Sequence, residues 1–240
     1  MEAARRDLRA VRELPEEHLA RDPGRRARAQ ALSPARRRFA SEAGLGAALL
    51  ALAVTVLGDL ARPGYDAATQ YISELGELGA AHGPLVSLGG FLPIGVLVLA
   101  FLALAAPELA PTRGTKAALA GIGCVGVAYV VAAFARCEPG CPADGPPRQL
   151  LHNAFGLLEY LGGGLGLALL GVSFRARPEW RSFVVPTLVA AAVVLVPFAV
   201  PGLADAIGRG FLQRLMDGAL FAWIAAAAWR VRSGKTLQPA

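Results

Sequence analysis

The feature that most constrains this chain is a series of long apolar runs separated by short polar breaks. A helix needs about 20 mostly apolar residues to cross the hydrocarbon core of a bilayer, and in lipid its backbone polar groups must be satisfied internally. Such runs cover residues 43–61, 84–106, 117–135, 150–173, 183–203 and 210–229. The sequence therefore predicts an all-α, polytopic membrane protein, built as a six-transmembrane-helix bundle.

The composition agrees with a membrane protein and disfavours an ordinary soluble enzyme. Apolar residues make up 55% of the chain and charged residues 18%, against about 25% charged in typical soluble domains. A pI near 9.8 would suggest nucleic-acid binding in a soluble protein. No aromatic interleaving and no recognisable reader motif accompany the arginines, however. We therefore expect the lipid bilayer as partner, no nucleic acid and no cofactor.

The positions of the basic residues predict the orientation of the spans. Fourteen Lys and Arg residues lie near the span ends on the side of the N-terminus, against four on the opposite side. Cytoplasmic loops carry the excess of Lys and Arg. Both termini are therefore expected in the cytoplasm, which an even number of spans also requires, and the protein is expected to be a multi-pass protein of the cell (plasma) membrane.

The chain divides into three parts. Residues 1–42 are rich in arginine and poor in large apolar side chains, which predicts a basic, mostly disordered cytoplasmic arm. The arm is too long and too charged for the first part of a cleaved signal peptide, so the first span is expected to stay as an anchor. Residues 43–230 are expected to form the transmembrane domain, and residues 231–240 a short cytoplasmic tail.

Glycines in the fourth run predict close helix packing. Gly162 and Gly166 form a Gly-x-x-x-Gly pair, and small residues at this spacing let the backbone of a neighbouring helix approach closely. Packing is the simplest interpretation of this motif.

Two cysteines bracket the sequence Cys-Glu-Pro-Gly-Cys in the loop after the third run. The charge distribution places this loop outside the cytoplasm, where disulfides form. A Cys137–Cys141 disulfide is the preferred interpretation, ahead of free thiols. A metal site comes last, because no second pair of soft ligands lies nearby, and no metal is expected. Cys124 lies within a span and is expected to be a small buried apolar residue.

Ionisable residues inside the apolar runs predict a polar pocket. A charge in hydrocarbon is costly and is retained where something compensates it. His152 and Glu159 are seven residues apart, on one face of a helix, and Asp217 reaches a similar depth in the last run, with Arg214 as the expected counter-ion of Glu159 or Asp217. Asp59 and Asp205 fall on the same side. The alternative is a buried salt-bridge network that only fixes helix packing.

The first outer loop, residues 62–76, contains a short amphipathic turn. Tyr71, Ile72 and Leu75 can dip into the membrane interface while Ser73 and Glu74 point elsewhere, so the loop could act as a lid. We include Glu74 among the candidate binding residues, and expect His82, further along this outer segment, to be solvated.

Several of these residues together resemble a known family. The resemblance rests on Pro63 and Tyr65, Ser73-Glu74-Leu75-Gly76, Phe134-x-x-Cys137-x-Pro139-Gly140-Cys141, His152-x-x-x-Gly156 and Arg214. In order and spacing they resemble the domain-of-unknown-function 998 family of small prokaryotic multi-span membrane proteins, over residues 43–230 or so. The resemblance implies six membrane helices and supplies no catalytic residues.

Three functions remain open from the sequence. The preferred one is a pocket facing outward that binds or transports a lipid headgroup or small amphiphile, with binding residues Asp59, Glu74, His152, Glu159, Arg214 and Asp217 and with proton coupling through Glu159. The second is an intramembrane hydrolase or transferase acting on lipid-linked substrates, with His152 as general base, Glu159 or Asp217 orienting it, and Ser73 as nucleophile. The third is a partner subunit whose polar network is structural.

Overall fold

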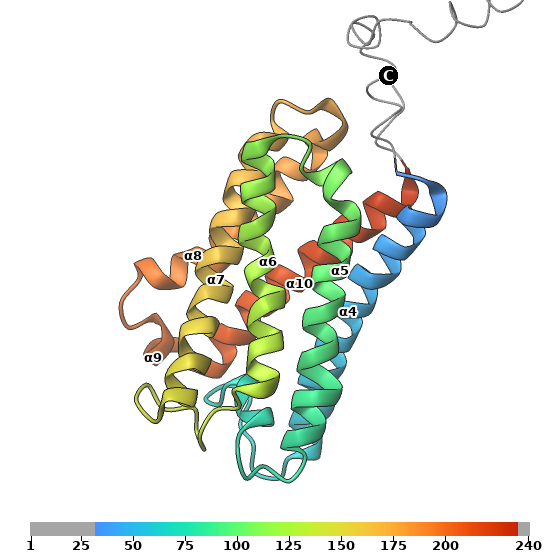
Figure 1. Cartoon of the computed structure of the whole chain (residues 1–240). Coiled ribbons are helices and arrows are strands. Elements are labelled where there is room, and N and C mark those ends of the chain that lie inside the picture. The colour runs from blue at the N-terminus through green and yellow to red at the C-terminus, as the bar shows by residue number, and fades with distance from the viewer. Residues whose placement is uncertain (1–31, 235–240) are drawn as a thin grey trace, which may run out of the picture.

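The computed structural model describes residues 32–234, which form a bundle of long helices (Figure 1). The helices are α4 (Pro34–Ala61), α5 (Leu92–Leu109), α6 (Arg113–Phe134), α7 (Pro147–Phe174), α8 (Val184–Ala199), α9 (Leu203–Ile207) and α10 (Arg209–Ser233), with short helices η1 (Ile72–Gly76), η2 (Leu85–Phe91) and η3 (Pro178–Phe183). The described residues contain no strand. The all-α prediction is confirmed.

Five of the six predicted spans form helices long and apolar enough to cross a membrane: Pro34–Ala61, Leu85–Leu109, Arg113–Phe134, Pro147–Phe174 and Pro178–Ala199. The sixth run lies within α10, a helix of 25 residues. Its mean hydropathy is lowered by polar residues such as Arg214 and Asp217, so α10 is not among the five. The chain is a multi-pass membrane protein, and the sixth crossing stays a prediction.

Two boundaries differ from those expected. The first helix begins at Pro34, after Ser33 caps it by accepting a hydrogen bond from the Arg36 backbone N–H, so the predicted arm overlaps this helix at residues 34–42. Residues 1–31 of the arm and residues 235–240 of the tail lie outside the described part. The fifth helix ends at Ala199 because Pro201 and Gly202, with a left-handed φ of 77°, turn the chain into α9.

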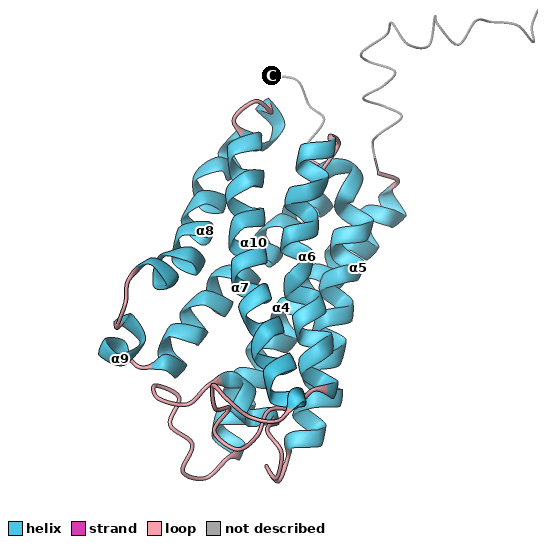
Figure 2. Cartoon of the chain, turned by 60° about the vertical axis from the view of Figure 1, so that its left-hand side comes forward, coloured by secondary structure: helices cyan, strands magenta, loops and turns pink. Residues whose placement is uncertain are grey.

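The two ends of the bundle differ in character. Figure 1 shows the start of α4 and the end of α10 at the same end. The opposite end, which we call the loop end, carries residues 62–84, which include the short helix η1, and residues 135–146; the loops at this end are pink in Figure 2. Beside the loop end, α9 lies to one side of the main bundle (Figure 2). The loop end is the side that the arginine distribution predicts to be outside the cytoplasm.

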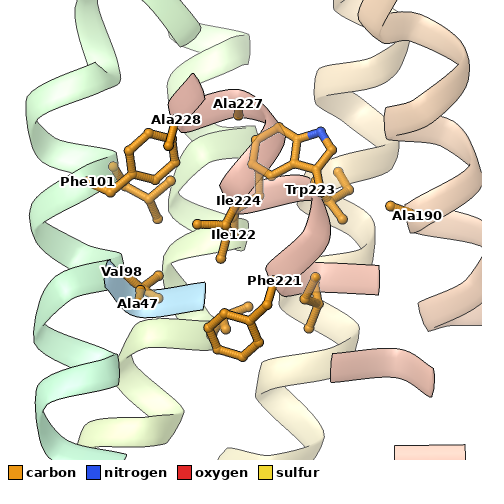
Figure 3. Packing of buried hydrophobic residues seen from close by; sticks show 14 of the residues in the cluster. Ala47, Val98, Phe101, Ile122, Ala190, Phe221, Trp223, Ile224, Ala227 and Ala228 are labelled. Carbon is orange, nitrogen blue, oxygen red and sulfur yellow. The ribbon is translucent and has the colours of Figure 1, made fainter. Parts of the chain in front are cut away.

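The core is centred on α10. Phe221 and Ile224 project from it into the bundle, where buried residues such as Phe101 and Ile122 lie, and Trp223 donates a hydrogen bond to Thr187 of α8 at 2.9 Å (Figure 3). Outward-facing positions are apolar as well, including Leu52 and Leu60 of α4 and Leu169 of α7, each at least 59% exposed. A bundle surrounded by lipid keeps its charged side chains in the interior and exposes apolar side chains, and this chain shows that pattern.

Close backbone contacts set the packing of α6 on α7. A Cβ atom on Gly166 would lie 2.5 Å from the Ala118 carbonyl oxygen, and one on Gly121 would lie 2.8 Å from the Gly162 carbonyl oxygen. Only glycine fits at these two positions without moving a backbone. The close packing predicted from the Gly162 and Gly166 pair is confirmed.

Candidate functional site

Two adjoining cavities lie at the loop end, between α7 and α10. The inner cavity has a volume of about 50 Å³ and is lined by residues that include Ser73, Tyr129, His152, Glu159 and Asp217. This volume holds a few water-sized groups, since one water needs roughly 10–15 Å³ by this measure. The structure thus brings together three residues placed on one pocket by sequence reasoning, His152, Glu159 and Asp217, with the proposed nucleophile Ser73.

The outer cavity is larger, at about 520 Å³. Ser73, His152, Gly156 and Gln213 line both cavities, so the inner cavity opens into the outer one. The outer walls are formed by side chains from α7, α8, α9 and α10: Leu157, Phe198, Ala204, Leu212 and Met216. An apolar chamber therefore leads to a small polar one.

Two tyrosines hold the Asp217 carboxylate. The Tyr160 hydroxyl donates to Asp217 Oδ1 at 2.9 Å, and the Tyr129 hydroxyl donates to Oδ2 at 3.2 Å. Hydrogen bonds to a charged group contribute about 1.5–3 kcal/mol each, which compensates part of the cost of burying Asp217, itself only 7% exposed. The two hydroxyls thus fix the carboxylate on the cavity wall.

Glu159 adjoins Asp217 and is not fully satisfied. Its side chain is 7% exposed, its carboxyl group lies beside that of Asp217, and among the described residues its Oε1 has no hydrogen-bond partner. An unpaired buried polar atom costs about 1–3 kcal/mol or more. Lysine and arginine side chains do not line the inner cavity. The cavity therefore presents two acidic groups and an unused acceptor.

His152 is held by the backbone of the preceding loop. Its Nδ1 lies 2.8 Å from the Ala135 carbonyl oxygen, and because a carbonyl only accepts, Nδ1 must be the donor. In the neutral ring this leaves Nε2 with the lone pair. The hydrogen bond thus selects the tautomer whose Nε2 can accept a proton.

Arg214 does not neutralise the acidic cavity, contrary to the sequence prediction. Its Nη2 pairs with Asp59 Oδ1 at 2.7 Å and donates to the Tyr65 hydroxyl at 2.9 Å, while Nη1 donates to the Gln70 carbonyl at 3.0 Å. Asp59 lies near the end of α4, and Arg214 reaches it from the side of α10 that faces the first loop. Arg214 and Asp59 therefore form a separate cluster that joins helices and loop.

Tyr65 completes this cluster. Burial raises the pKa of its hydroxyl to about 12, although the neighbouring Arg214 guanidinium acts in the opposite direction. The hydroxyl donates to the Tyr71 carbonyl oxygen at 2.6 Å and so stays neutral while it accepts from Arg214. Tyr65 fastens the first loop to the end of α10.

The loop turn η1 buries the candidate binding residue Glu74. Its side chain is 1% exposed, because its carboxylate accepts from the Tyr71 backbone N–H and Gln70 Nε2, both at 2.9 Å, and pairs with Arg209 at 3.2 Å. Ile72 and Leu75 are buried. Gln213 of α10 accepts from the Ile72 backbone N–H at 2.6 Å. The turn is fixed over the cavities by polar contacts.

The predicted disulfide is present. Cys137 and Cys141 form an S–S bond, and both side chains are buried. Their sulfurs and a ring nitrogen of His152 lie within 4.8 Å of one another, but sulfurs bonded to each other are not thiolate ligands for a metal. Cys124 is a free thiol that is only partly buried, rather than fully buried as expected. The disulfide forms part of the outer cavity wall through Cys141.

Two further predicted residues lie away from these cavities. Asp205 is exposed on α9 and His82 is exposed in the loop before η2, as expected for the latter. Neither lines the inner or the outer cavity. The acidic site thus consists of Glu159 and Asp217 with their tyrosine partners.

The comparison with protein families agrees with this arrangement. The profile of the family described as "Protein of unknown function (DUF998)" matches residues 45–230, which is most of the chain and all of the helical bundle but its two ends. The chain belongs to the DUF998 family. No curated protein and no solved structure matches it.

The residues that carried the DUF998 resemblance converge at the loop end. The Tyr65 hydroxyl meets Arg214 at 2.9 Å, and the Ser73 hydroxyl lies 3.4 Å from Cys141 Sγ. His152 reaches the backbone just before the disulfide. In this DUF998 chain, motifs far apart in sequence therefore build one structural unit around the cavities.

Sequence reasoning missed four groups of this DUF998 site. Tyr129 and Tyr160 carry no charge, so hydropathy gives no reason to single them out. Glu77 pairs with Arg62 at 2.6 Å and accepts from the Gly140 backbone N–H at 2.7 Å, which links the two outer loops. Arg136 donates to the Gly76 and Glu77 carbonyls. A search for hydrogen-bond donors to each buried carboxylate would have pointed to the tyrosines.

Proposed function

We propose that this integral membrane protein binds an amphiphile with a primary amine headgroup at the loop end, the amine entering the inner cavity. The observation that carries the proposal is the buried, unpartnered Oε1 of Glu159 beside the Asp217 carboxylate. Two neighbouring carboxyl groups in a low-dielectric site cannot both ionise at low cost, and an ammonium group between them would compensate their charge while donating hydrogen bonds. This narrows the lipid headgroup or small amphiphile expected from the sequence.

The size of the cavities supports a small amine head and an apolar tail. An ammonium group is compact and carries three donors, which suits a chamber of about 50 Å³. The outer chamber of about 520 Å³, with Phe198, Leu212 and Met216 on its walls, falls within the usual range of about 300–1,000 Å³ for ligand sites. Arg209 on the same wall would favour a phosphate next to the amine.

The test uses binding of dodecylamine to the purified full-length protein in detergent, measured by calorimetric titration. Dodecyltrimethylammonium carries the same charge and tail but no N–H donor and a bulkier head, so we expect it to bind at least about tenfold more weakly. Asp217→Asn and Glu159→Gln are expected to weaken dodecylamine binding by about tenfold or more. In Asp217→Asn one tyrosine hydroxyl can still donate to the amide oxygen, and the other can accept from the amide NH2 group, which preserves the local structure.

The matched control is Asp205→Asn, which removes a carboxylate at the same end but outside the cavities. Its binding should equal that of the unmodified protein. Equal affinity for the two amphiphiles, or unchanged binding in both Asp217→Asn and Glu159→Gln, would overturn the proposal.

One observation favours a second candidate, a hydrolase or transferase of lipid-linked substrates. Ser73 and His152 line both cavities, and the His152 tautomer leaves Nε2 free to act as a general base. The Ser73 hydroxyl contacts Cys141 Sγ at 3.4 Å, and no hydrogen bond joins it to His152 among the described residues. Because that contact between nucleophile and base is absent, we prefer the binding function. Loss of ester hydrolysis in both His152→Ala and Ser73→Ala would reverse this preference.

A further inference from the structure

A further cavity lies on the lipid-facing side of the bundle, away from the acidic site. It is a groove of about 400 Å³ between α4 and η2, and it shares no lining residue with the inner or outer cavity. We propose that this groove binds one acyl chain of an anionic phospholipid, whose phosphate is held by Arg62 and His82 at the loop end.

The α4 wall of the groove is one continuous stripe. Its residues repeat at spacings of three and four, which places them on one face of the helix: Leu50, Ala53, Val54, Leu57, Gly58 and Ala61. The stripe is apolar throughout. It follows the helix axis for three turns and ends at Arg62, the residue after the helix, so its direction is that of a lipid chain in the same leaflet.

The opposite wall is formed by a π-helix. Residues Leu85–Phe91 have this geometry, which is rare in proteins and frequent at functional sites. Pro93, which has no N–H to donate, follows directly in α5. Gly90 brings η2 against α4, since a Cβ there would lie 2.7 Å from Val54 Cγ2, whereas a Cβ on Gly89 would meet only the tip of Leu85, at 3.2 Å. Gly89 therefore leaves the groove open.

The lips of the groove favour an acyl chain as its occupant. Leu57 and Leu85 are 63% and 70% exposed, so the groove opens sideways to the surrounding lipid rather than into the bundle. The chains of that lipid are the apolar groups that reach such an opening in a membrane.

The charges at the loop end of the groove favour an anionic headgroup. Arg62 and Arg136 are close to the single carboxylate of Glu77: Arg62 pairs with it, and Arg136 donates to backbone carbonyls at 2.7 and 2.5 Å. The Arg136 guanidinium packs against Gly83, next to His82. Two guanidinium groups against one carboxylate leave an excess of positive charge, and a guanidinium group forms strong charge-assisted hydrogen bonds with a phosphate. His82 is exposed and adds a donor at the rim.

The experiment is native mass spectrometry of the full-length protein after equilibration with dioleoyl-phosphatidylglycerol or with dioleoyl-phosphatidylcholine. The two lipids have the same chains, and only the first carries a net negative charge. The unmodified protein is expected to retain phosphatidylglycerol at least about tenfold better. Ala53→Phe fills the groove and should abolish that retention, whereas Leu52→Phe, at the neighbouring lipid-facing position outside the groove, should not.

The headgroup contact has its own pair of variants. His82→Glu lowers the charge at the rim by one and should remove the preference for phosphatidylglycerol, while Arg148→Gln lowers the charge by the same amount at the same end but away from the groove. If Ala53→Phe does not fold, Gly89→Leu fills the groove from the other wall. Equal retention of both lipids by the unmodified protein would overturn the proposal, as would normal retention in the filled variants. Detection of a dimer of the unmodified protein that dissociates when the groove is filled would also overturn it, since a second copy would then be the occupant.

Discussion

Arg214 of α10 and Asp59 of α4 lie 155 positions apart in the sequence, yet Nη2 and Oδ1 are 2.7 Å apart in the structure. The pair joins the last helix to the first at the loop end. Both side chains are mostly buried, at 16% and 25% exposed. The closure of the bundle at this end thus depends on two residues from its two extremes.

Loss of either partner should destabilise the protein. Exposed ion pairs contribute about 0–1 kcal/mol, and breaking a fully buried pair costs about 3–5 kcal/mol, so Arg214→Ala and Asp59→Ala are each expected to cost roughly 1–3 kcal/mol. Arg214→Lys should be nearly as unstable as Arg214→Ala, because a lysine cannot reach Asp59, Tyr65 and the Gln70 carbonyl together. Unfolding of the single and double variants in detergent gives the coupling free energy. Additive losses would contradict direct coupling.

The disulfide is predicted to protect both loop cysteines from alkylation. The chain contains three cysteines, and only Cys124 is free. Maleimide added to the denatured, unreduced protein should therefore attach once, and after reduction three times, as counted by mass. For so short a loop the disulfide is worth about 2 kcal/mol, so Cys137→Ser with Cys141→Ser should lower the stability by that order. Three attachments without reductant would contradict the bond.

The raised pKa of the Tyr65 hydroxyl predicts that the folded protein loses stability at high pH. In the unfolded chain its hydroxyl ionises near the ordinary pKa of 10.0, whereas in the folded protein the pKa is about 12. The unfolded state therefore releases this proton first, so the stability contributed by the neutral hydroxyl is intact below pH 10 and is lost as the pH rises through 12. The difference in thermal midpoint between the unmodified protein and Tyr65→Phe should shrink over this range. A constant difference would contradict the assignment.

A six-span topology predicts that the C-terminus lies in the cytoplasm. A fluorescent protein fused to the C-terminus should then fold and fluoresce, and alkaline phosphatase fused after Ala143, at the loop end, should be active. A fusion after Ala176, beyond α7, provides the matched cytoplasmic control. Active phosphatase at the C-terminus would mean that α10 does not cross the membrane, and that only the five apolar helices do.

The helices were predictable because hydropathy and length act locally. The shared cavity of His152 and Glu159 followed from their spacing of seven residues, and Asp217 followed from its depth in the last run. The partner of Arg214 could not be predicted from the sequence. Asp59 and Asp217 are both expected on the same side of the membrane, and the rotation of α10 about its axis decides which of them Arg214 meets. That rotation is set by packing across the bundle, which periodicity in one sequence does not contain.

The turn η1 in the first loop shows a second limit of prediction from the sequence. Sequence patterns predicted that Ile72 and Leu75 would dip into the membrane interface, but both are buried inside the protein, and the patterns gave no reason to expect that Glu74 is buried as well. Its burial depends on Gln70, the Tyr71 backbone and Arg209 arriving together. Such satisfaction of a buried carboxylate needs three contacts at once, and it is visible only after the fold has brought them into place.

The glycine contacts between α6 and α7 have a mechanical consequence. Backbone lies against backbone at Gly121 and Gly166, so these helices cannot slide or separate without losing the contact along its whole length. They make one side of the acidic chamber a fixed wall. The outer cavity that leads to it has one wall on the end of α8, next to Pro197, and on α9, which lies between Gly202 and Gly208, both with positive φ. A molecule that enters through the outer cavity would therefore displace α8 and α9 more readily than α6 and α7.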